Sequence, residues 1–149
     1  EQKYINEVYE INYVDPYIDH SIKHTPVLRI KNWLDQNINI FGTQNKLTIN
    51  IIDASLTRIE RKNDSKKKYE ENTEFFYEMH YILEFLLYDD NDLILATTIV
   101  EAKRSTTSGK YISLSEKEKI VDTLILDSLI DVSLKSEELL KKYMFEFMI

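Results

Sequence analysis

The chain has 149 residues, a formal net charge of −7 and no cysteine. A chain of this length can bury a substantial core, and we expect one domain spanning residues 1–149. The acidic balance argues against a nucleic-acid partner, because neutralising phosphates needs a basic surface, and the lack of cysteine excludes disulfides, thiolate chemistry and cysteine-type zinc sites.

The N-terminal segment is predicted to be a strand. From Lys3 to Val14, apolar residues are mixed with polar ones in a pattern closer to strand alternation than to a helix. Asp15-Pro16 ends this strand, and a loop then runs to Thr25.

That loop contains a possible metal-binding pattern. His20 and His24 have the i, i+4 spacing of a helical metal pair, and Asp15 and Asp19 lie within the same ten residues. Pro16 and Pro26 bracket the segment and no apolar period runs through it, so a helix is not expected there. We therefore interpret the histidines as loop anchors that form hydrogen bonds, and predict no metal and no cofactor.

A first helix is predicted from Pro26 to about Gly42. Thr25 is suited to the N-cap and Pro26 to the first helical position. Apolar residues then recur at steps of three and four: Val27, Ile30, Trp33, Leu34 and Ile38.

The stretch "KLTINIIDASLTRIE" is predicted to be a strand with a β-bulge. Its apolar alternation changes phase at Ile51 and Ile52, and one extra residue on a strand exchanges its two faces. The polar run from Arg61 to Asn72, which includes Lys66, Lys67 and Lys68, is predicted to be a hairpin tip.

The strongest pattern in the sequence runs from Phe75 to Leu87, where every second residue is apolar. This predicts a long strand buried on one face. A turn at Asp89–Asp92 then predicts a hairpin in which Leu87 pairs with Ile94 and Tyr77 with Arg104, so that the guanidinium lies over the tyrosine ring.

The last element is predicted to be a long helix. Either Ser113 with Glu116 or Ser115 with Glu118 fits a capping box, and a wide apolar stripe continues to Tyr143. The order β-α-β-β-β-α predicts an α+β two-layer sandwich, with two helices on one face of a mostly antiparallel four-stranded sheet.

The stretch "VEAKRSTTSGK" is the candidate binding site. It resembles a phosphate loop only superficially, because Arg104 and Tyr111 stand where that motif needs Gly and Ser or Thr. The simpler interpretation is a polar strand end before a capped helix. The sharper hypothesis is an anion or lipid-headgroup contact formed by Lys103, Arg104 and Lys110, with Lys66, Lys67 and Lys68 as a second candidate.

No arrangement of residues in the sequence indicates catalysis. No paired carboxylates are placed across a cleft, and no nucleophile has a recognisable setting, so we expect the chain not to be an enzyme. A different class of function stays open: a small-molecule carrier or hydrolase with a cavity between sheet and helices. Tyr77, Tyr81, Trp33 and His20 would line that cavity.

Three stretches resemble a family of small, uncharacterised alphaproteobacterial envelope lipoproteins. They are "IDHSIKHTPVLRIKNWLDQNI", "LTINIIDASL" and "VEAKRSTTSGKYISLSEKEK". The element order is also similar to that of LptE-like lipopolysaccharide-assembly lipoproteins. None of their functional residues matches a motif here.

The resemblance implies export through a signal peptide and a lipid anchor on a cysteine just before Glu1, a residue that is not a start methionine. We therefore expect a non-catalytic, periplasm-facing lipoprotein domain in the cell envelope, at the outer membrane. Its partner would be an envelope protein or a glycolipid.

Overall fold

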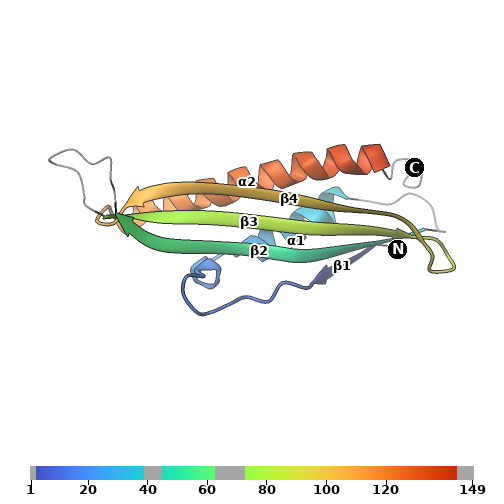
Figure 1. Ribbon diagram of the computed structural model, residues 1–149, viewed down its shortest axis with the longest axis horizontal. Helices are drawn as coiled ribbons and strands as arrows, with labels where there is room; N and C mark the ends of the chain where they lie inside the picture. The colour runs from blue at the N-terminus through green and yellow to red at the C-terminus, as the bar shows by residue number, and fades with distance from the viewer. Residues whose placement is uncertain (1–2, 39–44, 63–72, 144–149) are drawn as a thin grey trace.

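The chain folds in the predicted order β-α-β-β-β-α, with one additional short 3-10 turn. A computed structural model describes residues 3–38, 45–62 and 73–143 (Figure 1). The elements are β1 (Lys3–Glu7), η1 (Asp19–Ser21), α1 (Pro26–Asn37), β2 (Lys46–Lys62), β3 (Thr73–Tyr88), β4 (Ile94–Gly109) and α2 (Leu114–Tyr143).

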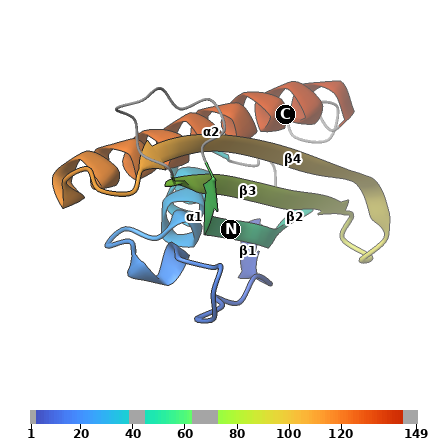
Figure 2. The same cartoon turned by 60° about the vertical axis from the view of Figure 1, so that its left-hand side comes forward.

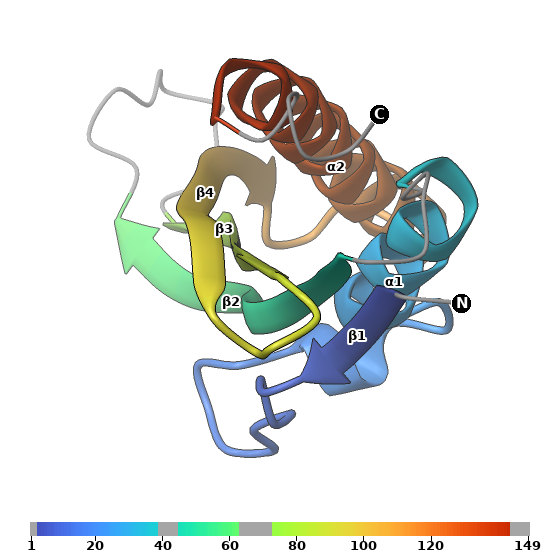
Figure 3. The ribbon, with the colours of Figure 1, turned by 90° about the vertical axis from the view of Figure 1, so that its right-hand side faces the viewer.

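The four strands form one sheet in the order β1-β2-β3-β4. β1 runs parallel to β2, and the other two pairings are antiparallel. Viewed along the strands, the sheet curves around α1 and α2, which lie together on its concave side (Figure 3). The predicted α+β two-layer class is confirmed.

The first strand is shorter than its sequence pattern predicted. The prediction ran to Val14, but β1 ends at Glu7. Immediately after it, the amides of Val8 and Tyr9 both donate to the carbonyl of Ile51, at 3.1 and 2.8 Å. Two donors on one acceptor cannot continue a regular ladder, so the chain leaves the sheet here.

The start of α1 is the predicted one. The Oγ1 atom of Thr25 accepts a hydrogen bond from the amide of Leu28 at 3.3 Å, and Pro26 occupies the first helical position. The helix ends at Asn37, before the predicted end near Gly42, and residues 39–42 of that prediction lie outside the described part.

The C-terminal end of α1 is tied to β1 by one lysine. The Nζ atom of Lys3 donates to three backbone carbonyls, those of Leu34 (3.2 Å), Asp35 (2.8 Å) and Ile38 (2.6 Å). A cation at this end satisfies free carbonyls and complements the negative end of the helix dipole.

β2 contains the predicted bulge. Its register with β3 passes from Ile51 opposite Leu83 to Asp53 opposite Ile82, so Ile52 is the extra residue. Beyond the bulge the two faces are exchanged, which directs Asp53 away from the core.

The alternation in β3 is confirmed. Its odd-numbered side chains from residue 77 to residue 87 are all buried, namely Tyr77, Met79, Tyr81, Leu83, Phe85 and Leu87. They pack against α1, α2 and the inward side chains of β2 and β4, and together these form a single cluster.

The predicted pairing of β3 with β4 was wrong by two residues. Leu87 lies opposite Ala96, not Ile94. The turn accounts for one of the two residues, because the amide of Asp89 donates to the carbonyl of Leu93 at 2.9 Å and Tyr88 is the residue opposite Ile94. A register shift between Leu87 and Tyr88, where Leu95 is the extra residue on β4, accounts for the other. A shift of two keeps every side chain on its predicted face.

The cap of α2 is the first of the two predicted ones. The Oγ atom of Ser113 accepts from the amide of Glu116 at 3.1 Å, and the helix begins at Leu114. α2 then runs along β4 for much of the length of the sheet (Figure 2).

Candidate functional site

The sheet has one face that no helix covers. Both helices lie on the other side, and within residues 3–38, 45–62 and 73–143 no second layer lies over this face (Figures 2 and 3). We call it the open face. Its central row consists of the even-numbered side chains of β3, from Glu74 to Tyr88, and all of them are partly exposed.

A polar stripe crosses the open face over three strands. The Nδ2 atom of Asn6 donates to Oδ1 of Asn50 at 3.1 Å, and Nδ2 of Asn50 donates to Oε1 of Glu84 at 2.9 Å. Each link joins side chains on neighbouring strands, so the stripe fixes the relative positions of β1, β2 and β3.

A histidine lies between two carboxyl groups nearby. The Nδ1 atom of His80 is 2.9 Å from Oδ2 of Asp53 on β2, and its Nε2 atom is 3.5 Å from Oε1 of Glu101 on β4. Nε2 and the Oδ1 atom of Asp53 are shielded from solvent and have no hydrogen-bond partner. The close contact of His80 with Asp53 therefore joins β3 to β2 on the open face, and Glu101 places a carboxyl group of β4 beside the same ring.

Apolar side chains are also exposed at separate positions on the open face. Ile99 is 62% exposed, Tyr4 50% and Ile59 46%. Isolated exposed apolar residues are ordinary, but several on one uncovered sheet face are typical of a surface that contacts another molecule.

The two neighbouring basic residues of the predicted binding site lie on opposite faces of β4. Lys103 is on the open face, where its Nζ atom is 3.6 Å from Oε1 of Glu78. Arg104 faces the helix side and lies opposite Met79. The predicted stacking of Arg104 on Tyr77 was therefore wrong, since Thr106 is the residue opposite that tyrosine.

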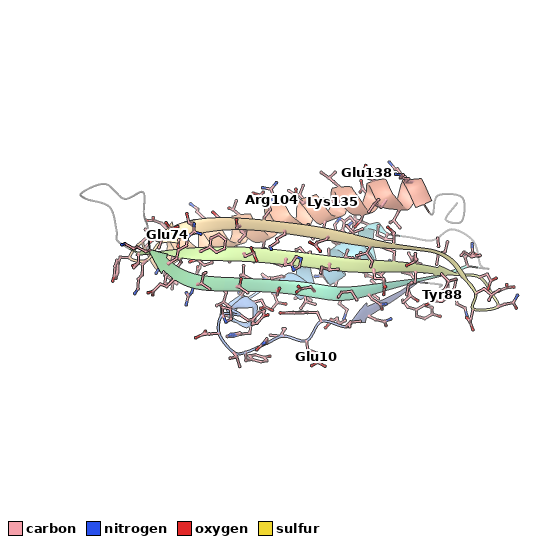
Figure 4. All side chains as sticks on the ribbon, viewed as in Figure 1. Glu10, Glu74, Tyr88, Arg104, Lys135 and Glu138 are labelled. Carbon is pink, nitrogen blue, oxygen red and sulfur yellow. The ribbon has the colours of Figure 1, made fainter. Side chains whose placement is uncertain are left out.

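Arg104 joins the sheet to α2 (Figure 4). Its Nε and Nη2 atoms donate to the two carboxyl oxygens of Asp131, and Nη1 is 4.0 Å from Oδ2 of Asp127. The hydrogen bond from Arg104 lowers the pKa of Asp131, and the same bond raises the pKa of the guanidinium.

The third predicted basic residue is also paired. The Nζ atom of Lys110 lies 2.8 Å from Oε1 of Glu60, and this hydrogen bond raises the pKa of the lysine. Lys66, Lys67 and Lys68 lie outside the described residues. The anion site therefore stays a prediction, and in this arrangement each described basic member has a carboxylate beside it.

A surface hollow of about 430 Å³ lies between β4 and α2, next to Arg104. Its lining combines basic side chains with apolar ones, and includes Lys119, Ile120, Leu124 and Asp127.

The β4 edge of the sheet is partly blocked by α2. The Nζ atom of Lys135 donates to the backbone carbonyl of Glu101 at 2.8 Å (Figure 4). Because this carbonyl accepts from a side chain, it points to the free edge instead of toward β3. The helix thus satisfies an acceptor that a further strand would otherwise use.

The N-terminal loop is anchored by a buried carboxyl group. Asp19 is fully buried, and its Oδ2 atom accepts from the hydroxyl of Tyr9 at 2.8 Å, while Oδ1 has no partner. The pKa of Tyr9 is raised, mainly by burial and to a smaller extent by the hydrogen bond to Asp19. The ring of His20 contacts that of Tyr13 in a tilted arrangement, with centroids 5.1 Å apart. The carbonyl of His24 accepts from Arg29 at 2.8 Å.

The described residues contain no group of three His, Asp or Glu side chains suited to a metal ion. Two of the residues expected to line a cavity between sheet and helices, Tyr77 and Tyr81, instead belong to the packed core. Tyr77 and Tyr81 are buried, with hydroxyl bonds to Ser108 (3.0 Å) and to the carbonyl of Pro26 (2.9 Å). The hollow beside Arg104 is lined by neither tyrosine.

Sequence reasoning missed the contact of Asp53 and Glu101 with His80. Alternation along β3 indicates only that His80 shares a face with Glu78 and Glu84, its neighbours on the same strand. The bulge could have revealed one partner, because the exchange of faces after Ile52 puts Asp53 on the face that His80 occupies.

Comparison with solved structures finds a likeness to the crystal structure of the rare lipoprotein B from Shewanella oneidensis. The TM-score is 0.45 at 16% identity, and the alignment covers 93% of this chain and 97% of that chain. No protein-family model matches the sequence, and neither does any curated protein. In the part of the chain that the structure describes, no helix has both the length and the apolar character needed to cross a membrane.

Proposed function

We propose that this chain is the non-catalytic, periplasm-facing domain of a cell-envelope lipoprotein at the outer membrane, and that its open face binds a partner protein. The envelope assignment is supported by the resemblance of the three sequence stretches named above. The binding assignment is supported by one observation: no described residue forms a layer over a broad sheet face, although exposed apolar side chains occur across it.

The chemistry of the open face fits a protein surface. Its charged groups are held in pairs, such as Lys103 with Glu78, so few of them would be left without a partner when water is excluded. Its amide groups and partly exposed apolar side chains offer the mixture of hydrogen bonding and apolar contact found in such interfaces.

A glycolipid is the second candidate, supported by the hollow beside Arg104. Lys119 could contact an anionic headgroup there, and Ile120 and Leu124 could contact an acyl chain. The existing bonds of Arg104 to Asp131 make this site weaker, because an anion would compete with a carboxylate already in place.

Site-specific photo-crosslinking of the full-length protein in its own cells tests the first candidate. A photoreactive residue replaces Ile99, which is 62% exposed on the open face. The matched control replaces Leu134, which is 61% exposed on α2. We expect a discrete protein adduct from position 99 and none from position 134.

An adduct from position 134 alone, or no adduct from either position, would contradict the open-face assignment. Labelling from position 99 with lipid but no protein would favour the glycolipid. Metabolic labelling of the full-length protein with a fatty acid tests the envelope assignment separately, since a lipoprotein incorporates the label on a cysteine upstream of this chain.

A further inference from the structure

The turn between β3 and β4 carries three consecutive exposed apolar residues. Leu93 is 64% exposed, Ile94 59% and Leu95 37%. We call them the apolar tip. A hairpin that only alternates between a core face and a solvent face would not place three such residues in succession at its end.

The turn itself does not need these apolar side chains. It is closed by Asp89, whose Oδ1 atom accepts from the amides of Asn91 (2.8 Å) and Leu93 (2.9 Å). Asp92 takes up the left-handed backbone conformation, with φ of 62°. Polar residues therefore form the bend, and the turn does not require the side chains of the apolar tip.

The apolar tip lies at one extreme of the long axis of the domain, and the start of β1 lies toward the same end (Figure 1). Lys3 pairs with Leu47, which in turn pairs with Leu87, next to the turn. A lipid anchor preceding β1 would hold this end of the domain, and not the opposite end near Glu74, close to a membrane (Figure 4).

We propose that the apolar tip inserts into the surface of a zwitterionic lipid bilayer; this inference rests on the proposed lipoprotein function. Stable protein interfaces bury about 800 Å² on each partner, which is far more than three side chains at a hairpin end provide. A bilayer needs no such area, because each apolar group that leaves water contributes by itself, at about 25 cal/mol per Å².

The residues at the base of the tip fit a lipid interface. Tyr88 lies on the open face opposite Ile94, and tyrosine is enriched where membranes meet water. The acidic residues of the turn favour a zwitterionic bilayer over an anionic one. Asp92 is 3.1 Å from Lys46, but Asp90 is a further negative charge at the same turn. An anionic bilayer would repel this end.

The absence of cysteine allows a direct test on the 149-residue chain. Leu93→Cys is labelled with an environment-sensitive dye, and the chain is tethered by an N-terminal histidine tag to phosphatidylcholine vesicles that contain a chelating lipid. We expect the dye emission to move to shorter wavelength when the chain is tethered, and shallow spin-labelled lipids to quench it. Leu134→Cys on α2 is the matched control and should show neither change.

A second variant measures the contribution of the tip. We expect the double substitution Ile94→Asp and Leu95→Asp to weaken binding of the untethered chain to the same vesicles by about tenfold or more, because two partly exposed apolar side chains become charged. Both positions are at the surface, so thermal unfolding should stay close to that of the parent chain.

Three results would overturn the proposal. The first is a dye at position 93 whose emission does not change when the chain is tethered, and the second is tighter binding to vesicles that contain phosphatidylglycerol. The third is an emission change that appears with rising protein concentration in the absence of vesicles. The last would identify a second copy of the chain as the occupant. The tether is artificial, so these results are independent of natural lipidation, whose absence would refute the proposed function instead.

Discussion

Removing the hydroxyl group of Tyr9 should destabilise the whole domain. In Tyr9→Phe the fully buried carboxyl group of Asp19 loses its 2.8 Å donor, and its other oxygen already has no partner. An unsatisfied buried acceptor costs about 1–3 kcal/mol, so we expect the free energy of unfolding to fall by about 2 kcal/mol. For a chain of this size the midpoint of thermal unfolding should fall by about 4–8 °C.

Urea unfolding followed by the fluorescence of the single tryptophan, Trp33, measures this change. The midpoint should shift while the slope stays constant, because the surface exposed on unfolding is unchanged. Tyr13→Phe is the control: this tyrosine lies in the same loop but is 73% exposed, and its substitution should change stability by less than about 0.5 kcal/mol.

The coupling between the two groups provides the decisive comparison. In a background of Asp19→Ala, Tyr9→Phe should cost about 0.5–3 kcal/mol less than it does in the parent chain. If Tyr9→Phe changes stability by less than its Tyr13 control, or costs the same in both backgrounds, the hydrogen bond does not anchor the loop and the reasoning is refuted.

Two further predictions concern β3. Leu83→Ala should lower the free energy of unfolding by about 2–5 kcal/mol because the side chain is fully buried. Ile82→Ala on the open face should lower it much less. Equal losses of stability in calorimetry would contradict an uncovered face. Burial raises the pKa of Tyr81 above its ordinary value of 10.0, so the unfolded chain ionises first and stability should fall as the pH rises beyond that value. The loss of stability with rising pH should be smaller in Tyr81→Phe, as measured by urea unfolding at a series of alkaline pH values. An identical dependence of stability on pH in the two chains would contradict this prediction.

The class of fold could be predicted because its signals are local. The alternation from Phe75 to Leu87 needs only a period of two, and the change of phase at Ile52 identifies the bulge without knowledge of any partner strand. The pairing of β3 with β4 depended on an extra residue, Leu95, and on the length of one turn. That length is set by hydrogen bonds of Asp89 within the turn, which the pattern of apolar residues does not encode.

The arrangement of the basic residues was less accessible to sequence reasoning. Strand alternation alone implies that Lys103 and Arg104 face opposite ways, so a single site built from both was a weak expectation. The partner of Arg104, by contrast, is Asp131 on a helix 27 positions away, and nothing local identifies it. Pairing between distant elements depends on how the helix lies against the sheet, which only the folded structure specifies.

The bond from Lys135 to the carbonyl of Glu101 has a consequence for the time before the fold is complete. β4 is 16 residues long and forms one side of the sheet, so on its own it is a template to which another chain can add. The lysine that blocks it comes from α2, the last of the described elements. During synthesis or refolding, therefore, the β4 edge stays open to pairing with another chain until α2 has docked. Aggregation competes with folding in that interval.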